Sequence, residues 1–360
     1  ELVVSEIDDC HYRLHMNLDL LQFVVQSFKV MMDDLAQVWR GETLAPLAIT
    51  FRDYVMAEQA RRQTPAWHDA WDYWQEKLPQ LPLAPELPVV ETAAETPRFT
   101  TFKSTIGKKE WQAVKQRWQQ QGVTPSAALL TLFATALERW SRTPAFTLNL
   151  TFFNRQPIHP QINQLIGDFT SVTLVDFNFS TPVTLQEQMQ QTQRRLWQNM
   201  AHSEMNGVEV IRELGRLRGS QRQPLMPIVF TSMLGMTLEG MTIDRAMSHL
   251  FGEPCYVFTQ TPQVWLDHQV MESDDELMFS CMDNVLEPGA AEAMFNDYCA
   301  ILQAVMTSPE SLKTSTSGIA GHIPRRRWPL SAQADYDLRD IEQATLEHPH
   351  IQQARAEISD

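Results

Sequence analysis

The sequence predicts an α/β protein built from two lobes. The chain has 360 residues, which is long for one simple core and suits two lobes of about 100–200 residues each. Strand and helix periodicities occur in both halves, with strands concentrated in the second. A Pro-rich stretch at 78–97 shows neither period. Because proline breaks helices, we expect this stretch to be an extended connection between the lobes.

In the first half the periodicity predicts one strand and two helices. Residues 11–19 alternate apolar and polar side chains, which is typical of a strand. From 20 to 39 apolar residues recur every three or four positions, which predicts a helix, and Gly41 supplies its stop. Asp19 lies at the junction, where it can cap this helix. Residues 51–78 predict one further helix.

The second half is predicted to alternate helices with strands. One helix start is marked by Thr124 as the cap and Pro125 at the first helical position. Helices are expected around Trp111, from Thr124 to near Trp140, over 184–202 and from 289 to about 306. Strands are expected near 98–106, 146–152, 172–178, 227–233, 255–259, 263–270 and 276–282.

Composition argues against several classes of partner. The formal net charge of −15 repels polyphosphate backbones, and the basic run Arg325–Arg327 is too short to reverse that field, so we expect no nucleic acid. The most apolar stretches fall short of the roughly 18 residues that span a membrane, and no charged-then-apolar leader precedes them. We therefore expect a cytoplasmic protein without membrane contact.

The cysteines do not predict a metal site. They are Cys10, Cys255, Cys281 and Cys299. Since they lie far apart and form no CxxC pair, neither zinc binding nor a disulfide framework has support from spacing. We expect buried free thiols and no metal.

In PIVFTS at 227–232, Thr231 faces away from Ile228 and Phe230 on the expected strand. Its hydroxyl could therefore project into a cavity. A purely structural role is equally open, because β-branched residues suit strands.

The segment QVWLDHQV at 263–270 places a carboxylate in mid-strand. Alternation predicts a polar, aromatic-lined face made of Gln263, Trp265, Asp267 and Gln269. Asp267 there needs a cation, a hydrogen-bond partner or a role as acid or base, so an ion pair and catalysis both stay open. His268 falls on the apolar face, where a core histidine is expected.

Two further segments contain polar residues beside strands. Asn154-Arg155 and GDFTS at 167–171, which includes Asp168, each close a turn. Asn, Gly and Asp are ordinary turn residues. Turn formation alone explains them.

Eight segments taken together resemble the ordered motif series of the heterocyclization domains of nonribosomal peptide synthetases, over roughly residues 10–310. They are DLLQFVVQS at 19–27, DYW at 72–74, LPLAPELP at 81–88, LNLTFFNRQPIHP at 148–160, GDFTS at 167–171, GVEVIREL at 207–214, VFTS at 229–232 and QTPQVWLDHQ at 260–269. Single motifs are weak signals, whereas the ordered series is specific.

The resemblance implies a V-shaped pseudo-dimer of two chloramphenicol-acetyltransferase-like lobes. Residues 1–80 then form the C-terminal part of the first lobe, which is incomplete because the family's opening motifs are absent. Residues 81–97 form the inter-lobe linker and 98–324 the second lobe. Residues 325–360 form a linker or remnant leading to a further domain, since DIEQATLEHPHI resembles part of an adenylation domain.

The resemblance also implies an activity. The family joins a donor acyl thioester to the amine of a carrier-bound Cys, Ser or Thr, then cyclodehydrates the product to a thiazoline or oxazoline. We expect cysteine and a thiazoline, in siderophore biosynthesis. The implied partners are upstream donor and downstream acceptor carrier proteins and neighbouring megasynthase domains. The domain itself binds no cofactor, because its substrates arrive on the carriers' 4′-phosphopantetheine.

Site roles follow from the same resemblance. Asp267 and Thr231 are the cyclodehydration pair, and Gln263, Asn154 and Ser232 position the intermediate. The structural members of the motifs are Asp19, Val24, Ser27, Arg155 and Asp168.

Besides the absent opening motifs, the chain departs from the family at two positions. Val24 replaces the second Asp of DxxxxDxxS, and a Val side chain cannot accept a hydrogen bond. A Trp expected beside Asp283 is missing. Val24 and the incomplete first lobe keep open a degenerate domain that binds carrier proteins without turnover. An ordinary condensation domain would carry His-His-x-x-x-Asp-Gly, where this chain has Asp19 to Val24.

Overall fold

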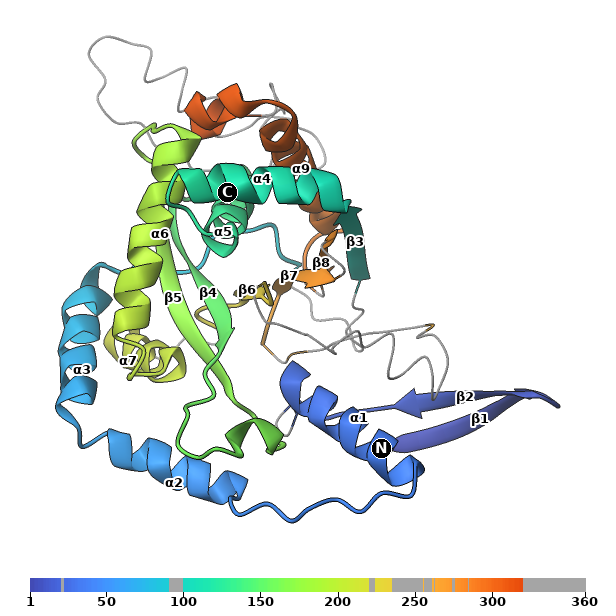
Figure 1. Cartoon of the computed structure of the whole chain (residues 1–360). Coiled ribbons are helices and arrows are strands. Elements are labelled where there is room, and N and C mark those ends of the chain that lie inside the picture. Colours follow the sequence, from blue (N-terminus) through green and yellow to red (C-terminus); the bar gives the residue numbers. More distant parts are fainter. Residues whose placement is uncertain are drawn as a thin grey trace, which may run out of the picture.

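A six-stranded mixed sheet forms the centre of the molecule (Figure 1). The computed structural model describes residues 1–20, 23–90, 100–219, 224–234, 255, 261, 263–273, 276–283 and 285–319. The strands of the sheet are β3 (Thr100–Ile106), β4 (Ala145–Phe153), β5 (Thr170–Asn178), β6 (Ile228–Ser232), β7 (Leu266–Ser273) and β8 (Glu276–Asp283). They lie in the order β3-β8-β7-β6-β4-β5, with β4, β6 and β7 mutually parallel and the other neighbours antiparallel. The predicted α/β class is confirmed.

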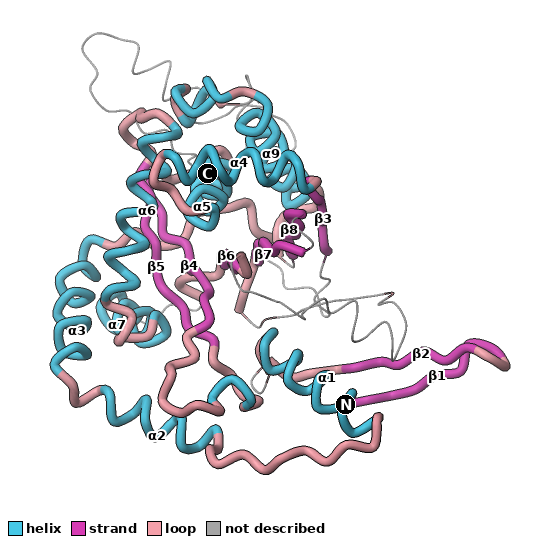
Figure 2. The backbone as a smooth tube through the Cα atoms, viewed as in Figure 1, coloured by secondary structure: helices cyan, strands magenta, loops and turns pink. Residues whose placement is uncertain are grey.

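Helices cover one face of this sheet (Figure 2). They are α4 (Lys108–Gln120), α5 (Pro125–Glu138), α6 (Leu185–Ala201) and α9 (Ala290–Thr307). Trp111 and Trp118 of α4 are fully buried, as their helical spacing predicts. At the start of α5 the Thr124 hydroxyl accepts a hydrogen bond from the backbone N–H of Ala127 at 3.3 Å, and Pro125 opens the helix. The predicted cap is confirmed.

Most predicted strands are confirmed to within a few residues, with two exceptions. The strand predicted at 255–259 lies outside the described residues, apart from Cys255. The strand predicted from 263 begins at Leu266, because Gln263 adopts a turn conformation with φ of 64°. A residue in the left-handed region cannot continue an extended ladder.

The N-terminal part contains β1 (Leu2–Asp8) and β2 (His11–Met16), which form an antiparallel hairpin, and helix α1 (Val25–Trp39). The predicted helix from residue 20 therefore starts later, and Asp19 is not its cap. The N-cap is Val24, in an extended conformation and without a side-chain cap. Its side chain is buried against the second half of the chain, so long-range packing rather than capping chemistry sets this helix start.

The single helix predicted over 51–78 was wrong, because two helices occupy this range. They are α2 (Phe51–Arg61) and α3 (Pro65–Lys77), followed by a short 3₁₀ turn at Leu78–Gln80. Thr64 is extended and caps α3 through the Trp67 N–H, with Pro65 at the first helical position. A residue before proline avoids the helical region, and proline lacks the N–H that would continue a helix. The Thr-Pro pair is the same start signal as at 124–125.

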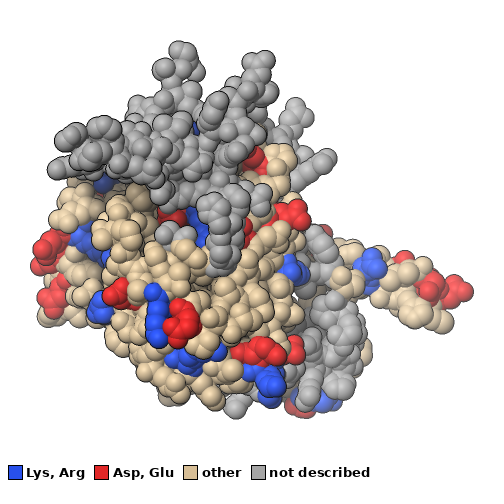
Figure 3. Space-filling view, turned by 90° about the horizontal axis from the view of Figure 1, so that it is seen from above, with Lys and Arg blue, Asp and Glu red and all other residues tan. Residues whose placement is uncertain are grey.

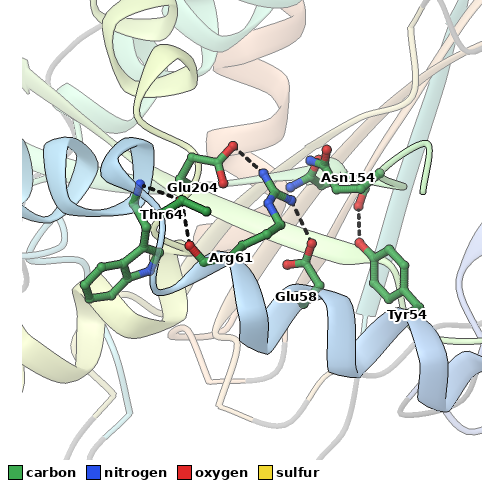
Figure 4. Close-up of polar contacts among 8 residues, drawn as sticks. Tyr54, Glu58, Arg61, Thr64, Asn154 and Glu204 are labelled. Atoms are coloured by element: carbon green, nitrogen blue, oxygen red, sulfur yellow. Dashed lines mark hydrogen bonds and ion pairs between the residues drawn. The ribbon is translucent and has the colours of Figure 1, made fainter.

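Helix α2 fastens the N-terminal part to the loops beyond β4 and α6 (Figure 4). The Tyr54 hydroxyl donates to the backbone oxygen of Asn154 at 2.8 Å. Arg61 pairs with Glu58 of its own helix at 2.7 Å and also with Glu204, beyond the end of α6. These contacts fix the end of β4 from outside the sheet.

Helix α3 packs against β5 and against α7 (Gly207–Arg218), a helix that sequence periodicity did not indicate. Trp74 shares an apolar cluster with Leu174 of β5 and Val210 of α7. At the edge of this cluster Lys77 lies 2.9 Å from the carboxylate of Asp176. The N-terminal part is therefore joined to the second half through apolar and ionic contacts.

The described part of the Pro-rich stretch follows the surface of the second half. The backbone N–H of Thr147 donates to Leu83 O at 2.8 Å, and the backbone N–H of Val90 donates to Val285 O at 2.8 Å. Because these bonds satisfy backbone groups that would otherwise face water, residues 81–90 are held along β4 and the end of β8.

All four cysteines are free, and Cys281 is buried. Cys10 and Cys255 are exposed, so the expectation of buried thiols was wrong for these two. No helix in the described part of the chain is long and apolar enough to cross a membrane. On the face seen in Figure 3, acidic and basic side chains are interspersed rather than gathered by sign.

Gly207→Ala is expected to destabilise the protein strongly. A Cβ at this position would lie 2.3 Å from the Val172 backbone oxygen, which β5 holds in the sheet. Overpacking of this kind costs about 1–3 kcal/mol, measured as a lower urea midpoint. Gly215→Ala in the same helix is the control, because its Cβ would meet Leu225 at an ordinary 3.4 Å. An unchanged midpoint for Gly207→Ala would contradict the close approach.

Candidate active site

The face of the sheet opposite helices α4, α5, α6 and α9 carries two rows of side chains in register, which include Asp267 and Thr231. Strand register aligns Asn149 of β4, Val229 of β6, Asp267 of β7 and Met282 of β8 in the first row. The second row holds Thr151, Thr231, Gln269 and Ser280 in the same strand order. Because side chains in register share a face, the structure brings Thr231 and Asp267 together on adjacent strands.

Asp267 has no cationic partner among the described residues. Its Oδ2 accepts a hydrogen bond from Gln269 Nε2 at 2.7 Å, whereas its Oδ1 is buried and has no partner in the described part of the chain. Burial raises the pKa of Asp267 to about 6, although the Gln269 amide and then the Thr231 hydroxyl favour the ionised form. The structural ion pair left open by the sequence is not present there.

Thr231 lies diagonally across from Asp267, in register with Gln269. Its hydroxyl is close enough to lower the pKa of Asp267, but it makes no full hydrogen bond to Oδ1. The side chain is partly buried. A hydroxyl and a carboxyl oxygen thus face the same space on this side of the sheet.

His268 points to the opposite, helix-covered face, as its place in the alternation predicts. Its ring is 1% exposed and stacks on Phe133 of α5 at 4.4 Å between ring centroids. Neither ring nitrogen has a hydrogen-bond partner among the described residues. Burial lowers the pKa of His268 to about 3, so this histidine is a neutral core residue.

Gln263 lies in the turn before β7, not on the strand face. Its side chain is exposed, and it is the one non-glycine residue with positive φ in the described part of the chain. Such a conformation costs about 1–3 kcal/mol and occurs frequently at functional sites. The structure does not place Gln263 in the rows that contain Asp267.

Asn154 follows the end of β4, three residues beyond Thr151 in the second row. Its side-chain oxygen accepts from Gln156, and its backbone is held by Phe169 and by Tyr54. It therefore lies at the margin of the polar face rather than beside Asp267.

Ser232 ends β6 in register with Val270, on the helix-covered side. Its hydroxyl is 2.8 Å from that of Ser126 at the start of α5. The structure therefore directs Ser232 away from Asp267.

Arg155 organises the loop after β4. Its guanidinium lies 3.7 Å from the ring centroid of Phe169 and donates to the backbone oxygens of Ile162 and Leu165 at 2.6 and 2.9 Å. Desolvation lowers the pKa of Arg155 to about 10. Nearby, Asp168 accepts from the Thr170 N–H at 2.9 Å, which is the turn role that the sequence predicts.

The motif at 19–27 meets the motif at 167–171 through Ser27. Its buried hydroxyl donates to Gly167 O at 2.7 Å and accepts from the Gly167 N–H at 3.1 Å. A Cβ at Gly167 would lie 2.3 Å from the Phe51 ring, so the close approach requires glycine.

Val24 belongs to the apolar cluster around this contact. It is 7% exposed and shares the cluster with Tyr54, Ile162 and Phe169. Asp19 is exposed and precedes the helix. Neither residue lies on the strands that carry Asp267.

Sequence reasoning did not single out Asn149 or Gln269 as site residues. Asn149 aligns with Asp267 across the sheet, and its buried Oδ1 has no partner in the described ranges. The alternation of β7 already placed Gln269 on the same face, which was the available signal. No group of three or more His, Cys, Asp or Glu side chains that could hold a metal occurs among the described residues.

Known proteins are similar in sequence to this chain over most of its length. Pyochelin synthetase PchF from Pseudomonas aeruginosa (strain UCBPP-PA14) is 34% identical over 340 residues, covering 91% of this chain and 18% of PchF. Phenyloxazoline synthase MbtB from Mycolicibacterium paratuberculosis is 36% identical over 349 residues, covering 94% of this chain and 29% of MbtB. The chain thus spans less than a third of either relative.

Solved structures share the fold. The cyclization-docking bidomain of the nonribosomal peptide synthetase EpoB from Sorangium cellulosum aligns with a TM-score of 0.75 and 33% identity, covering 86% of this chain and 63% of that one. The X-domain from teicoplanin biosynthesis aligns with a TM-score of 0.70 at 16% identity, covering 89% and 74%, which shows the fold alone. The condensation domain family model matches residues 25–315. This chain therefore belongs to the condensation domain family of nonribosomal peptide synthetases.

Proposed function

We propose that this condensation-family domain is a heterocyclization domain that forms a thiazoline on carrier-bound substrates. One observation carries the proposal: the partly buried Asp267 faces the polar side of the sheet beside Thr231, with Oδ1 buried and without a partner among the described residues. The ordered motif series and the similarity to PchF, MbtB and the EpoB cyclization domain support it.

The first step is amide formation. The amine of a carrier-bound cysteine attacks the carbonyl carbon of the donor thioester, a C–N bond forms, and the C–S bond to the donor carrier breaks. The amine proton goes to the departing thiolate, which leaves as the free thiol of 4′-phosphopantetheine. Both substrates are tethered, so the domain needs to orient them rather than bind free metabolites.

The second step closes the ring. The cysteine thiol adds to the new amide carbonyl, a C–S bond forms, and the carbonyl oxygen becomes a hydroxyl. Loss of that hydroxyl together with the nitrogen-bound proton gives a C=N bond and one water. Asp267 takes the proton from nitrogen and returns it to the departing hydroxyl, while the Thr231 hydroxyl orients that oxygen or stabilises its developing charge.

The pKa of Asp267 suits this proton transfer. A group with a pKa of about 6 is largely ionised at neutral pH and yet remains a competent proton donor after it has accepted a proton. A solvated aspartate, with a pKa near 3.9, is a weaker base. Burial on the sheet therefore gives the carboxyl a pKa that suits both acceptance of the proton from nitrogen and its donation to the departing hydroxyl.

The acceptor and pathway rest on resemblance. Within the family, the motif sequences of this chain are similar to those of a cyclization domain in yersiniabactin synthetase high-molecular-weight protein one. This likeness favours cysteine over serine or threonine and a siderophore as the product. The partners are then an upstream donor carrier, a downstream acceptor carrier and the adjoining megasynthase domains, in the cytoplasm.

The experiment mixes the domain with a donor-loaded and a cysteinyl-loaded carrier protein and analyses the carrier-bound products by mass spectrometry. Ring formation appears as loss of one water from the condensed product. We expect the ring. Linear amide alone indicates an ordinary condensation domain, and no product from two loaded carriers indicates a non-catalytic carrier-binding domain.

Val24→Asp is expected to leave the ratio of ring to open amide unchanged. Val24 lies in the cluster around Phe169 and not on the strands that carry Asp267, so its replacement does not alter the proton-transfer groups. Product ratios are measured on the same carriers, with Val55→Asp on α2 as the control. Urea midpoints of both variants verify folding. Ring formation only in Val24→Asp would favour the degenerate alternative.

A further inference from the structure

We propose that Gln269 is a positioning residue, which holds the Asp267 carboxyl by one oxygen and leaves the other available to the reacting intermediate. This inference rests on the proposed function. Gln269 itself neither gains nor loses a proton in the reaction. Its carboxamide acts on the substrate only through Asp267.

The contact between the two side chains is local and one-sided. Gln269 follows Asp267 by two residues on β7, so both side chains project from the same face. Gln269 Nε2 donates to Oδ2 at 2.7 Å, and Oδ1 has no partner among the described residues. The bond therefore selects which carboxyl oxygen remains open.

The strand that carries both residues is held on either side. β7 lies between β6 and β8, and Gln269 is in register with Thr231 and Ser280. A central strand has both sets of backbone hydrogen bonds made. Since the backbone is fixed, the direction of the Asp267 carboxyl depends on its side-chain partner.

No charged group among the described residues of the neighbouring strands takes part in positioning the Asp267 carboxyl. On β7 the neighbouring His268 faces the core and is neutral at working pH, because burial lowers its pKa to about 3. On β8 the Cys281 thiol lies on the helix-covered face, and burial raises its pKa. On β3 Lys103 is exposed and in register with Ser280, two strands away from β7. β6 and β4 contribute Thr231 and Asn149, which do not titrate.

A neutral amide beside Asp267 affects the pKa of its carboxyl differently from a cation at the same position. A Lys or Arg beside Asp267 would lower its pKa strongly and weaken it as a base. Burial raises the pKa of Asp267, and the Gln269 amide acts in the opposite sense by stabilising the ionised carboxyl. Gln269 thereby keeps Asp267 ionised at neutral pH and still basic enough to take the proton from nitrogen.

The test compares pH profiles of ring formation from preformed linear amide on its carrier. Gln269→Met removes the donor at similar size, and Gln269→Glu adds a like charge. We expect the midpoint of the rising limb to increase by about one pH unit in Gln269→Met, and by more in Gln269→Glu. The Gln269→Met rate should be about two-fold low at pH 7 and should recover toward the wild-type rate above pH 8.

Gln190→Met is the matched control, because the Gln190 side chain donates to the backbone oxygen of Gln121 and lies on α6, a different element from the strand that carries Asp267. It should keep the wild-type midpoint. The KM for the carrier should stay constant in all variants, and urea midpoints identify any variant that fails to fold.

A uniformly lower rate with an unchanged midpoint in both Gln269 variants would overturn the inference, since that pattern indicates a merely structural side chain. A different result would refute the proposed function. If Asp267→Asn forms ring at the wild-type rate, the role of Asp267 is wrong. If Asp267→Asn loses the ring while Gln269→Met keeps the wild-type midpoint, only the role of Gln269 is wrong.

Discussion

Asp267→Asn is expected to produce the open-chain amide in place of the ring. The variant keeps the size of the side chain and can still accept from Gln269, so the fold and the condensation step should persist. It removes the group that takes the proton from nitrogen. General acid–base catalysis of this kind contributes about 10²–10⁴-fold, and we expect ring formation to fall by that factor, measured by mass spectrometry of carrier-bound product.

The matched control for this substitution is Asp168→Asn. Asp168 accepts from the Thr170 N–H in a turn, and an asparagine oxygen can accept the same bond. Asp168→Asn should therefore form ring at the wild-type rate. Equal ring formation by Asp267→Asn and Asp168→Asn would refute the assignment of Asp267, whereas loss in both would point to a general effect of charge or folding.

His268→Phe is expected to make the protein more resistant to acid. In the folded state burial lowers the pKa of His268 to about 3, whereas an unfolded histidine titrates near 6.5. Below about pH 6.5 the unfolded chain therefore binds a proton that the folded chain excludes. This one group lowers the unfolding free energy by up to about 1.4 kcal/mol per pH unit, between roughly pH 6.5 and pH 3.

Phenylalanine removes this titration and suits the site. The His268 ring lies among aromatic rings, stacked on Phe133 and edge-on to Tyr298 at 4.5 Å. Urea unfolding at several pH values between 4 and 7 measures the slope, which should be shallower in His268→Phe. His68→Phe, at an exposed position on α3, is the control for loss of a histidine elsewhere. An identical slope for His268→Phe would mean that the histidine is protonated in the folded core.

Local sequence signals determined the elements whose ends depend on local chemistry. Thr124-Pro125 marked the start of α5, and the alternation from Leu266 to Val270 correctly separated His268 in the core from Asp267 on the polar face. The same Thr-Pro signal at 64–65 lies inside a longer helical pattern, which predicts one helix where the structure has two. Capping and periodicity are properties of a few neighbouring residues, so the sequence by itself contains them.

Tertiary structure decided the contacts between distant segments. Only strand register aligned Asn149 with Asp267, and only packing joined Ser27 to Gly167. Periodicity assigns each strand a face but not a neighbour or an offset, because those depend on which strands pair.

The candidate site shows the same division between local and distant information. The sequence placed Asp267 and Thr231 among polar strand residues and connected them to a reaction through an ordered motif series. It could not show that Oδ1 lacks a partner among the described residues, that Gln269 occupies Oδ2, or that burial raises the pKa of Asp267. The desolvation and directed hydrogen bonds that set the chemistry exist only once the sheet has formed.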